Sequence, residues 1–182
     1  MKKPIIFLLD DDSAVLKSVE RDVRAEFRKN YRIIATQSAK EALDALPEFK
    51  KKGENVALFL SDQRMPEMLG VAFLEKAKAF YPDAKRILLT AYSDTDAAIK
   101  AINEVKLDYY LLKPWDPPEE KLHPILRDQL EAWQCSYIPE ASGLRIVGHQ
   151  WSPKSHQIKD FLSGNLVPYR WMNIETSAQG KE

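Results

Sequence analysis

Five short apolar runs, each followed by a stretch with helical periodicity, constrain the fold of this chain more than any other feature. The runs contain few polar residues and occupy residues 5–9, 31–35, 56–60, 86–89 and 109–112. Continuous apolar runs, in contrast to alternating ones, are typical of parallel strands that are buried on both faces. Parallel strands need crossover connections, and the amphipathic stretches supply them as helices. The pattern predicts an α/β domain over residues 1–133, with a doubly wound, five-stranded parallel sheet.

Local signals within the amphipathic stretches predict where helices begin and end. Ser38 stands three residues before Glu41, which is the spacing of a capping box, so a helix should begin there. Pro47 should kink or end that helix. A fourth helix is expected over residues 93–105. Pro124 interrupts the last helical pattern, so a short first turn and then a bend or a restart are expected.

The last quarter of the chain has a different organisation. Residues 134–143 lack periodicity and are predicted to form a linker. Residues 144–182 then predict one strand, one helix and one more strand. Two strands and one helix bury too little apolar surface to be stable alone. We therefore expect a partial β-α-β extension at this end of the chain.

Charge and cysteine content argue against several classes of function. The chain has 27 Lys and Arg and 27 Asp and Glu, so no net charge draws it to nucleic acid or to an acidic membrane. The single cysteine, Cys135, cannot form a disulfide or a multi-cysteine zinc site within the chain. The first apolar run is too short for a signal peptide or a membrane span. We expect a cytoplasmic protein with neither a membrane nor a nucleic-acid partner.

Charged and hydroxyl side chains follow four of the five predicted strands. Ligands of open parallel sheets bind where the strands end at their carboxyl side. The side chains at these four ends are Asp10, Asp11 and Asp12, then Asp62, then Thr90, and then Lys113. Two carboxylates about 4 Å apart repel by roughly 4 kcal/mol at an effective dielectric constant near 20, so such a cluster attracts a cation. Mg²⁺ fits this site, because it binds few carboxylates and keeps positions open for phosphate oxygens.

A site of this composition is suited to phosphoryl transfer. Asp62 would be the nucleophile, because it ends a rigid strand that faces the first acidic group, and Thr90 and Lys113 would contact the phosphoryl oxygens. Each residue taken alone has a simpler interpretation, because Asp often caps a helix and Lys-Pro often forms a turn. Their joint occurrence at four strand ends favours a phosphoryl-transfer site over these simpler interpretations.

Four motifs resemble the receiver domain of two-component response regulators. They are Asp10-Asp11-Asp12, Asp62-Gln63-Arg64-Met65-Pro66, Thr90-Ala91 and Lys113-Pro114, in the order and spacing of that family across about residues 3–133. The resemblance implies a flavodoxin-like fold for the first domain. It also implies Mg²⁺ as the cofactor, with four ligands: Asp10, Asp11, Asp62 and the backbone carbonyl of Arg64, while Asp12 is a third acid beyond the pair.

The same resemblance implies a role for each remaining residue of the site. Asp62 corresponds to the phosphoacceptor, Thr90 to the switch hydroxyl and Lys113 to the phosphate-binding lysine. Tyr110 corresponds to the aromatic switch residue. The bond between Lys113 and Pro114 is typically cis in this family, which a tertiary amide permits at low cost.

The family also implies the reaction and the partners. A histidine kinase or a phosphotransfer protein would donate a phosphoryl group to Asp62, so the chain would be a signalling domain and not an enzyme, apart from self-phosphorylation and self-dephosphorylation. Thr90 and Lys113 would then move inward, and Tyr110 would fill the vacated space. This movement would switch a face made by the fourth helix, the fifth strand and the last helix, near Tyr109 and Trp115, toward a partner or a second copy of the chain.

Three positions depart from the family pattern. Leu69 precedes Gly70 at a place where a small or acidic residue is common. Arg64 and Tyr92 are bulky residues on the path of the water that attacks the acyl phosphate. We expect Arg64 and Tyr92 to shield the acyl phosphate and to slow its hydrolysis.

The tail has a fainter resemblance of its own. Residues 147–155 and the following helix are similar to the opening of a thioredoxin- or glutaredoxin-like module, as found ahead of thioredoxin-reductase-like flavoproteins. Ser152 and Ser155 stand at the positions of the redox dithiol, so disulfide exchange is excluded there and docking is the expected role. The chain has no GxGxxG motif after a strand, so it should not bind a dinucleotide in that way. We expect one piece of a longer regulator.

Two alternative functions are consistent with parts of this pattern. The pair Asp10-x-Asp12 after a buried strand resembles the nucleophile motif of haloacid-dehalogenase-like phosphatases, which would make Asp10 the covalent site. That motif usually continues with Thr or Val where this chain has Ala14. The second alternative is a receiver-like binding module that takes no phosphate, although the chain keeps every charged residue of the site.

Overall fold

The structure, a computed structural model, describes residues 2–91, 107–136, 144–149, 151–164 and 169–174. The chain divides into two compact units, Met1–Tyr137 and Ile138–Glu182. The helix expected over residues 93–105 lies outside the described residues, as does Tyr92. In the described part of the chain, no helix is both long enough and apolar enough to span a membrane.

The first unit contains a five-stranded parallel sheet, which confirms the predicted fold class. Its strands are β1 (Ile5–Leu9), β2 (Arg32–Thr36), β3 (Val56–Asp62), β4 (Lys85–Thr90) and β5 (Tyr109–Leu112). The order across the sheet is β2-β1-β3-β4-β5, with every pair parallel. This is the flavodoxin-like order, in which the chain reverses its direction of growth between β1 and β3. Ligands bind at that reversal, outside the carboxyl ends of the strands.

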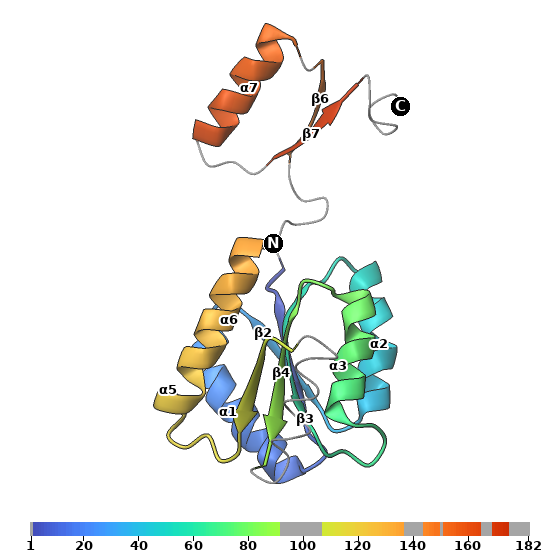
Figure 1. The fold of residues 1–182 in the computed structure, drawn as a ribbon, viewed down its shortest axis with the longest axis vertical. Helices are drawn as coiled ribbons and strands as arrows, with labels where there is room; N and C mark the ends of the chain where they lie inside the picture. The colour runs from blue at the N-terminus through green and yellow to red at the C-terminus, as the bar shows by residue number, and fades with distance from the viewer. Residues whose placement is uncertain (1, 92–106, 137–143, 150, 165–168, 175–182) are drawn as a thin grey trace. The chain divides into compact units, whose positions relative to one another are not determined.

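Helices cover both faces of this sheet (Figure 1). One face carries α1 (Ser13–Phe27), α5 (Pro118–Lys121) and α6 (His123–Ser136), and the other carries α2 (Ala39–Lys51) and α3 (Gly70–Phe80). The restart at α6 confirms the prediction made from Pro124. Cys135 is exposed in the last turn of α6.

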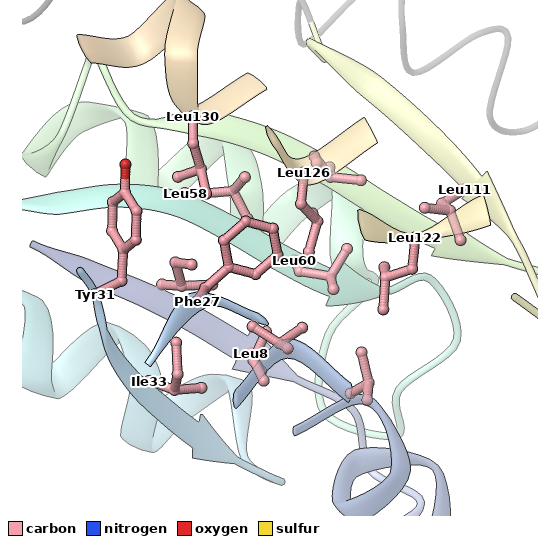
Figure 2. Close-up of a cluster of buried hydrophobic side chains, with 14 of the residues drawn as sticks. Leu8, Phe27, Tyr31, Ile33, Leu58, Leu60, Leu111, Leu122, Leu126 and Leu130 are labelled. Atoms are coloured by element: carbon pink, nitrogen blue, oxygen red, sulfur yellow. The ribbon is translucent and has the colours of Figure 1, made fainter. Parts of the chain in front are cut away.

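Two apolar clusters hold the helices against the sheet. Successive side chains of β1 alternate between them: Ile6 and Leu8 face α1 and α6, whereas Ile5, Phe7 and Leu9 face α2 and α3. Figure 2 shows the first cluster, in which strand residues meet Phe27 of α1 and a row of leucines from the last helical segment, Leu122, Leu126 and Leu130. Because both faces are covered, β1 and β3 are buried throughout and β4 almost so, as their continuous apolar sequences predicted, whereas the edge strands β2 and β5 keep exposed residues.

The second helix tests two of the local signals. Ser38 is its N-cap, and the Ser38 hydroxyl accepts a hydrogen bond from the backbone N–H of Glu41 at 3.2 Å, as predicted. The expectation that Pro47 could end this helix is wrong, because α2 continues to Lys51. Leu46, the residue before Pro47, is fully buried in the cluster under α2, and this packing compensates for the backbone hydrogen bond that proline cannot donate.

The second unit has the expected strand, helix and strand. These are β6 (Leu144–Gly148), α7 (Pro153–Gly164) and β7 (Tyr169–Asn173), and β6 pairs with β7 in parallel. The unit leaves large apolar side chains exposed, among them Trp151 and Phe161.

Candidate functional site

The carboxyl ends of β1, β3 and β5 bring three charged side chains into direct contact. The Lys113 ammonium lies between two carboxylates, with its Nζ 2.7 Å from Oδ2 of Asp10 and 2.5 Å from Oδ1 of Asp62. Asp62 is the last residue of β3, and Asp10 and Lys113 directly follow β1 and β5. The hydrogen bond from the Lys113 backbone N–H to the Thr90 carbonyl oxygen, at 2.9 Å, fixes the end of β5 beside β4. The predicted convergence of Asp10, Asp62 and Lys113 is therefore present.

Burial determines the electrostatics of this group. Asp10 is 1% exposed, and loss of water around its carboxylate raises its pKa even though Lys113 favours the charged form. Burial also opposes the charged form of Lys113, but hydrogen bonds from its ammonium to Asp10 and Asp62 outweigh this effect and raise the Lys113 pKa. The group therefore contains one positive charge that is shared by two carboxylates, and it retains an excess of negative charge.

The loop after β3 holds the second oxygen of Asp62. The backbone N–H of Arg64 donates to Oδ2 of Asp62 at 2.6 Å, while Oδ1 accepts from Lys113. The Ser61 hydroxyl donates to the backbone carbonyl of Asp62 at 2.9 Å. Both oxygens of the Asp62 carboxylate are thus held in defined directions by a charge and a backbone dipole.

Gly70 permits the close approach of backbone that closes this loop. A Cβ atom at Gly70 would lie 1.9 Å from the carbonyl oxygen of Asp62, which no side chain can accommodate. The Gly70 N–H donates to the Gln63 carbonyl at 3.0 Å, so the loop returns on itself. Gly70 was not among the predicted site residues, and the available signal was a glycine eight residues after Asp62. Leu69 is 55% exposed and is the N-cap of α3 without a side-chain capping bond.

The other two aspartates of the first motif have different surroundings. Asp12 is the N-cap of α1, and its Oδ1 accepts from the backbone N–H groups of Ala14 at 2.7 Å and Val15 at 3.3 Å. Asp11 is partly exposed, and its backbone carbonyl accepts from Gln37 Nε2 at 3.0 Å. Among the residues that the structure describes, no three His, Cys, Asp or Glu side chains lie close enough together to hold a metal ion. The Asp11 carboxylate is therefore not gathered with those of Asp10 and Asp62.

The predicted switch residues lie on β4 and β5. Thr90 is fully buried, and its hydroxyl donates to the Ala91 carbonyl at 3.2 Å. Tyr110 is exposed on β5, where its ring stacks on that of Tyr109 with 6.1 Å between the centroids. The Lys113–Pro114 peptide bond is cis, which confirms that expectation. Trp115, predicted to lie near the partner face, is buried in the apolar cluster with residues of α1 and α6, and its part in a partner face stays a prediction.

The chemistry of the donor set fits a hard divalent cation. Asp10 and Asp62 present carboxylate oxygens that already share one cation, the Lys113 ammonium. Oxygen ligands of this kind are the ones that Mg²⁺ prefers. The negative charge left after pairing with Lys113 is what such an ion would neutralise.

Comparison with known families gives one match that covers most of the first unit. The family model described as the response regulator receiver domain matches residues 6–126. The tail beyond residue 126 lies outside this match, which lends no support to its thioredoxin-like resemblance.

Curated relatives match the same region. The chain is 31% identical over 131 residues to the hydrogenase transcriptional regulatory protein HoxA of Cupriavidus necator, covering 72% of this chain and 25% of that protein. It is 36% identical over 119 residues to the DNA-binding transcriptional regulator NtrC of Proteus hauseri, covering 65% of this chain and 23% of that protein. The chain thus spans about a quarter of the length of the curated relatives it matches.

Solved structures share the fold of the first unit. A crystal structure of an uncharacterized protein from Neptuniibacter caesariensis has a TM-score of 0.64 and 35% identity, covering 75% of this chain and 94% of that one. A CheY-like response regulator receiver domain protein from Methanospirillum hungatei has a TM-score of 0.62 and 25% identity, covering 75% of this chain and 100% of that one.

Proposed function

Because this chain belongs to the response regulator receiver domain family, we propose that Asp62 is its phosphoacceptor in two-component signalling. The observation that carries this proposal is the position of the Lys113 ammonium, which contacts Asp62 Oδ1 at 2.5 Å and Asp10 Oδ2 at 2.7 Å. Asp62 ends a buried strand, and the side chains around it belong to three neighbouring strands. A carboxylate on a rigid strand with fixed donors on both oxygens is poised for in-line attack.

The proposed reaction forms one bond and breaks one bond. An oxygen of the Asp62 carboxylate attacks the phosphorus of a phosphohistidine or a small acyl phosphate, and the donor leaves with the electron pair of the broken bond. Lys113 is a permanent positive charge beside the oxygen that attacks, so it can pair with the phosphoryl oxygens as they arrive. The Arg64 N–H holds the other carboxylate oxygen and thereby keeps the group oriented.

We assign Asp10, Asp11, Asp62 and the backbone carbonyl of Arg64 as the residues that would hold Mg²⁺. The Asp11 carboxylate would have to move toward the other two, because the three are not gathered in the structure. When bound, this ion would neutralise negative charge on the phosphoryl group and on the carboxylates. Asp10 supports the assignment best, because its carboxylate is buried and its pKa is raised, so an added positive charge would stabilise its ionised form.

The proposed partners are a histidine kinase or a phosphotransfer protein as donor, and a protein that recognises the phosphorylated form. Thr90 and Tyr110 would relay the change from Asp62 to the face along β5. A cavity of about 620 Å³ runs along this strand, with Tyr109, Tyr110 and Ile125 in its lining. The exposed, stacked tyrosines offer apolar area for a partner or for a second copy of the chain.

A phosphatase that uses Asp10 as nucleophile is less well supported. Its second acid would be Asp12, which instead caps α1 with its carboxylate. Asp10 is 1% exposed and is paired with Lys113, whereas Asp62 is 7% exposed. A binding module that takes no phosphate would not require Lys113 to lie between Asp10 and Asp62.

The proposed role of Asp62 is tested by phosphorylation with acetyl phosphate and Mg²⁺, followed by intact mass measurement and mapping of the modified residue. The wild-type chain should gain one phosphoryl group on Asp62, and Asp62→Asn should gain none. Modification of Asp10 in the wild-type chain would establish the phosphatase alternative. Absence of any modification, with no response to beryllofluoride, would establish the binding module.

The proposal extends to residues 144–182 and to the location of the protein. We infer that the chain is one part of a longer cytoplasmic regulator in which residues 144–182 dock as a thioredoxin-like segment without redox chemistry. Ser152 and Ser155 at the dithiol positions and the parallel β6–β7 pair support this inference. Determining the intact mass of the natural gene product tests it.

A further inference from the structure

One carboxylate is buried in α1, away from the site. Asp22 is 7% exposed and lies on the apolar stripe of this helix, beside Val23 and one turn from Val19. Burying an ionised carboxylate is costly unless it is paired and hydrogen-bonded. Its contacts therefore show what Asp22 does in the fold.

Asp22 connects three segments that are distant in the sequence. Its Oδ2 accepts a hydrogen bond from the indole Nε1–H of Trp115 at 3.0 Å, and its Oδ1 accepts from Nε of Arg21 at 2.8 Å. Its backbone carbonyl lies 2.9 Å from Nε2 of His123, the first residue of α6. One residue thus links α1 to the loop after β5 and to the start of α6.

The loop after β5 has empty space on one side. A cavity of about 580 Å³ lies between α1 and this loop, and its lining includes Val15, Ser18, Asp22, Trp115 and residues 113–114. The Trp115 side chain is itself 8% exposed and lies in the apolar cluster of α1 and α6, so the loop is held by this packing and by its polar contacts. The Lys113 N–H is held by Thr90, and the next described side-chain anchor along the chain is the indole of Trp115 on Asp22.

We propose that Asp22 is a positioning residue for Lys113. By holding Trp115, two residues further along the chain, Asp22 keeps the loop against α1 and keeps the Lys113 ammonium directed between Asp10 and Asp62. The proposal rests on the proposed function of Lys113 at Asp62. A buried hydrogen bond between a carboxylate and an indole N–H is charge-assisted and short of competing water, which makes it a strong anchor for one loop.

The test compares two substitutions at Asp22, one that removes both side-chain oxygens and one that keeps a single acceptor oxygen. Asp22→Leu removes the acceptor, and the rate of phosphorylation by acetyl phosphate and Mg²⁺ should fall about tenfold, because small displacements of a positioned group lower rates strongly. Asp22→Asn keeps an oxygen that can accept from Trp115, and its rate should stay within about twofold of wild type. Trp115→Phe removes the donor and keeps an aromatic ring, so it should behave like Asp22→Leu.

Glu26→Gln is the matched control. Glu26 also links α1 to α6, through an ion pair with Arg127 at 2.5 Å, and this contact does not involve the loop after β5. The phosphorylation rate of the Glu26→Gln variant should equal that of wild type. Thermal unfolding establishes that each variant is folded, and Trp115→Phe replaces Asp22→Leu in every comparison if the latter does not fold.

A double-mutant cycle with Lys113→Ala separates positioning from general stability. If Asp22 acts through Lys113, Asp22→Leu should change the rate by less than about twofold in the Lys113→Ala background, although it still lowers the melting temperature. An equal tenfold loss in both backgrounds, or no loss in either, overturns the role of Asp22. A Lys113→Ala variant as fast as wild type instead overturns the proposed function of Lys113.

Discussion

Each end of the parallel sheet has one group of three charged side chains in mutual contact, and the two groups have opposite composition. At the carboxyl ends one cation lies between two carboxylates, and at the amino ends one carboxylate lies between two cations. We refer to them as the carboxyl-end triad, which is Asp10, Asp62 and Lys113, and the amino-end triad, which is Lys85, Arg86 and Asp108.

The amino-end triad is built into the sheet. Asp108 Oδ1 lies 3.2 Å from Lys85 Nζ, and Asp108 Oδ2 accepts from the backbone N–H of Arg86 at 2.9 Å. The backbone N–H of Asp108 donates to the Arg86 carbonyl at 3.0 Å, so these contacts join β4 to β5. Within the described part of the chain, Arg86 Nε and Nη1 are buried without a hydrogen-bond partner. This group therefore serves the fold.

The carboxyl-end triad has a surplus of negative charge that the fold does not neutralise. Burial raises the pKa of Asp10, although Lys113 is in contact with it. The comparison shows that the number of charges does not separate a structural group from a functional one. What differs between the two triads is the sign of the surplus charge, which is negative at the carboxyl ends and positive at the amino ends. The predictions below test this distinction, from the largest expected effect to the smallest.

Removing a lysine should slow phosphorylation only when that lysine belongs to the carboxyl-end triad. Lys113→Ala should slow phosphorylation by acetyl phosphate about 100-fold, because it removes the positive charge beside the attacking carboxylate. Lys85→Ala removes a lysine from the other triad and should leave the rate within about twofold. Measuring the two rates by intact mass checks the prediction, and equal losses in both variants would remove the functional difference between the triads.

Adding a Cβ atom at a glycine should also lower the free energy of unfolding more at the carboxyl end of the sheet than at the amino end. Gly70→Ala places a Cβ 1.9 Å from the Asp62 carbonyl and should lower the free energy of unfolding by more than about 3 kcal/mol. Gly53 precedes β3 at the amino end and has a φ of 64° with no atom near its Cβ position, so Gly53→Ala should cost only about 1 kcal/mol. Urea unfolding of both variants measures the difference. An equal loss of unfolding free energy in the two variants would contradict the close approach of Gly70 to the Asp62 carbonyl.

Neutralising the single carboxylate of the amino-end triad should change stability without changing activity. Asp108→Asn keeps an acceptor for the Arg86 N–H but leaves two cations without a counter-charge, one of them largely buried. The expected loss is about 1–2 kcal/mol, discounted because Asp108 and Lys85 are partly exposed. Urea unfolding gives the loss, and a changed phosphorylation rate would show that this end also serves the reaction.

The smallest effect concerns pH and Asp10. Its pKa in the folded chain is raised above the ordinary value of 3.8, so folding disfavours the ionised form. The Asp10 contribution to stability is therefore complete below pH 3.8 and is lost as the pH rises through the folded-state pKa. Without divalent cations, Asp10→Asn should melt a few degrees above wild type at pH 7.5, and the difference should shrink toward pH 4. A difference independent of pH would contradict this account.

The fold and most of the site could be predicted because both depend on local patterns. Continuous apolar runs such as residues 5–9 specify buried parallel strands, and the topology of such sheets gathers strand ends at one edge. Asp10, Asp62, Thr90 and Lys113 were predicted for that reason. The structure confirms that Asp10, Asp62 and Lys113 meet there. The roles of all these residues, and of Asp11 and the Arg64 carbonyl as metal ligands, remain predictions.

The features that the sequence did not reveal depend on contacts between distant segments. Trp115 has an aromatic side chain that suits a surface or a core equally well, and only its packing among residues of α1 and α6 decides the matter. Asp22 carried a visible signal, a charged residue on the apolar stripe of α1, but its partner lies 93 residues further along the chain. Pro47 was misjudged because local propensity cannot include the buried contacts of its helix.

The exposed thiol at the end of α6 gives this protein an experimental handle. Cys135 is the single cysteine of the chain, and it lies two residues before the boundary between the two compact units. A maleimide dye will therefore label one defined position without mutagenesis. Its anisotropy and its quenching by Trp133, two residues earlier in α6, will report in real time whether treatment with acetyl phosphate changes the surroundings of the end of α6.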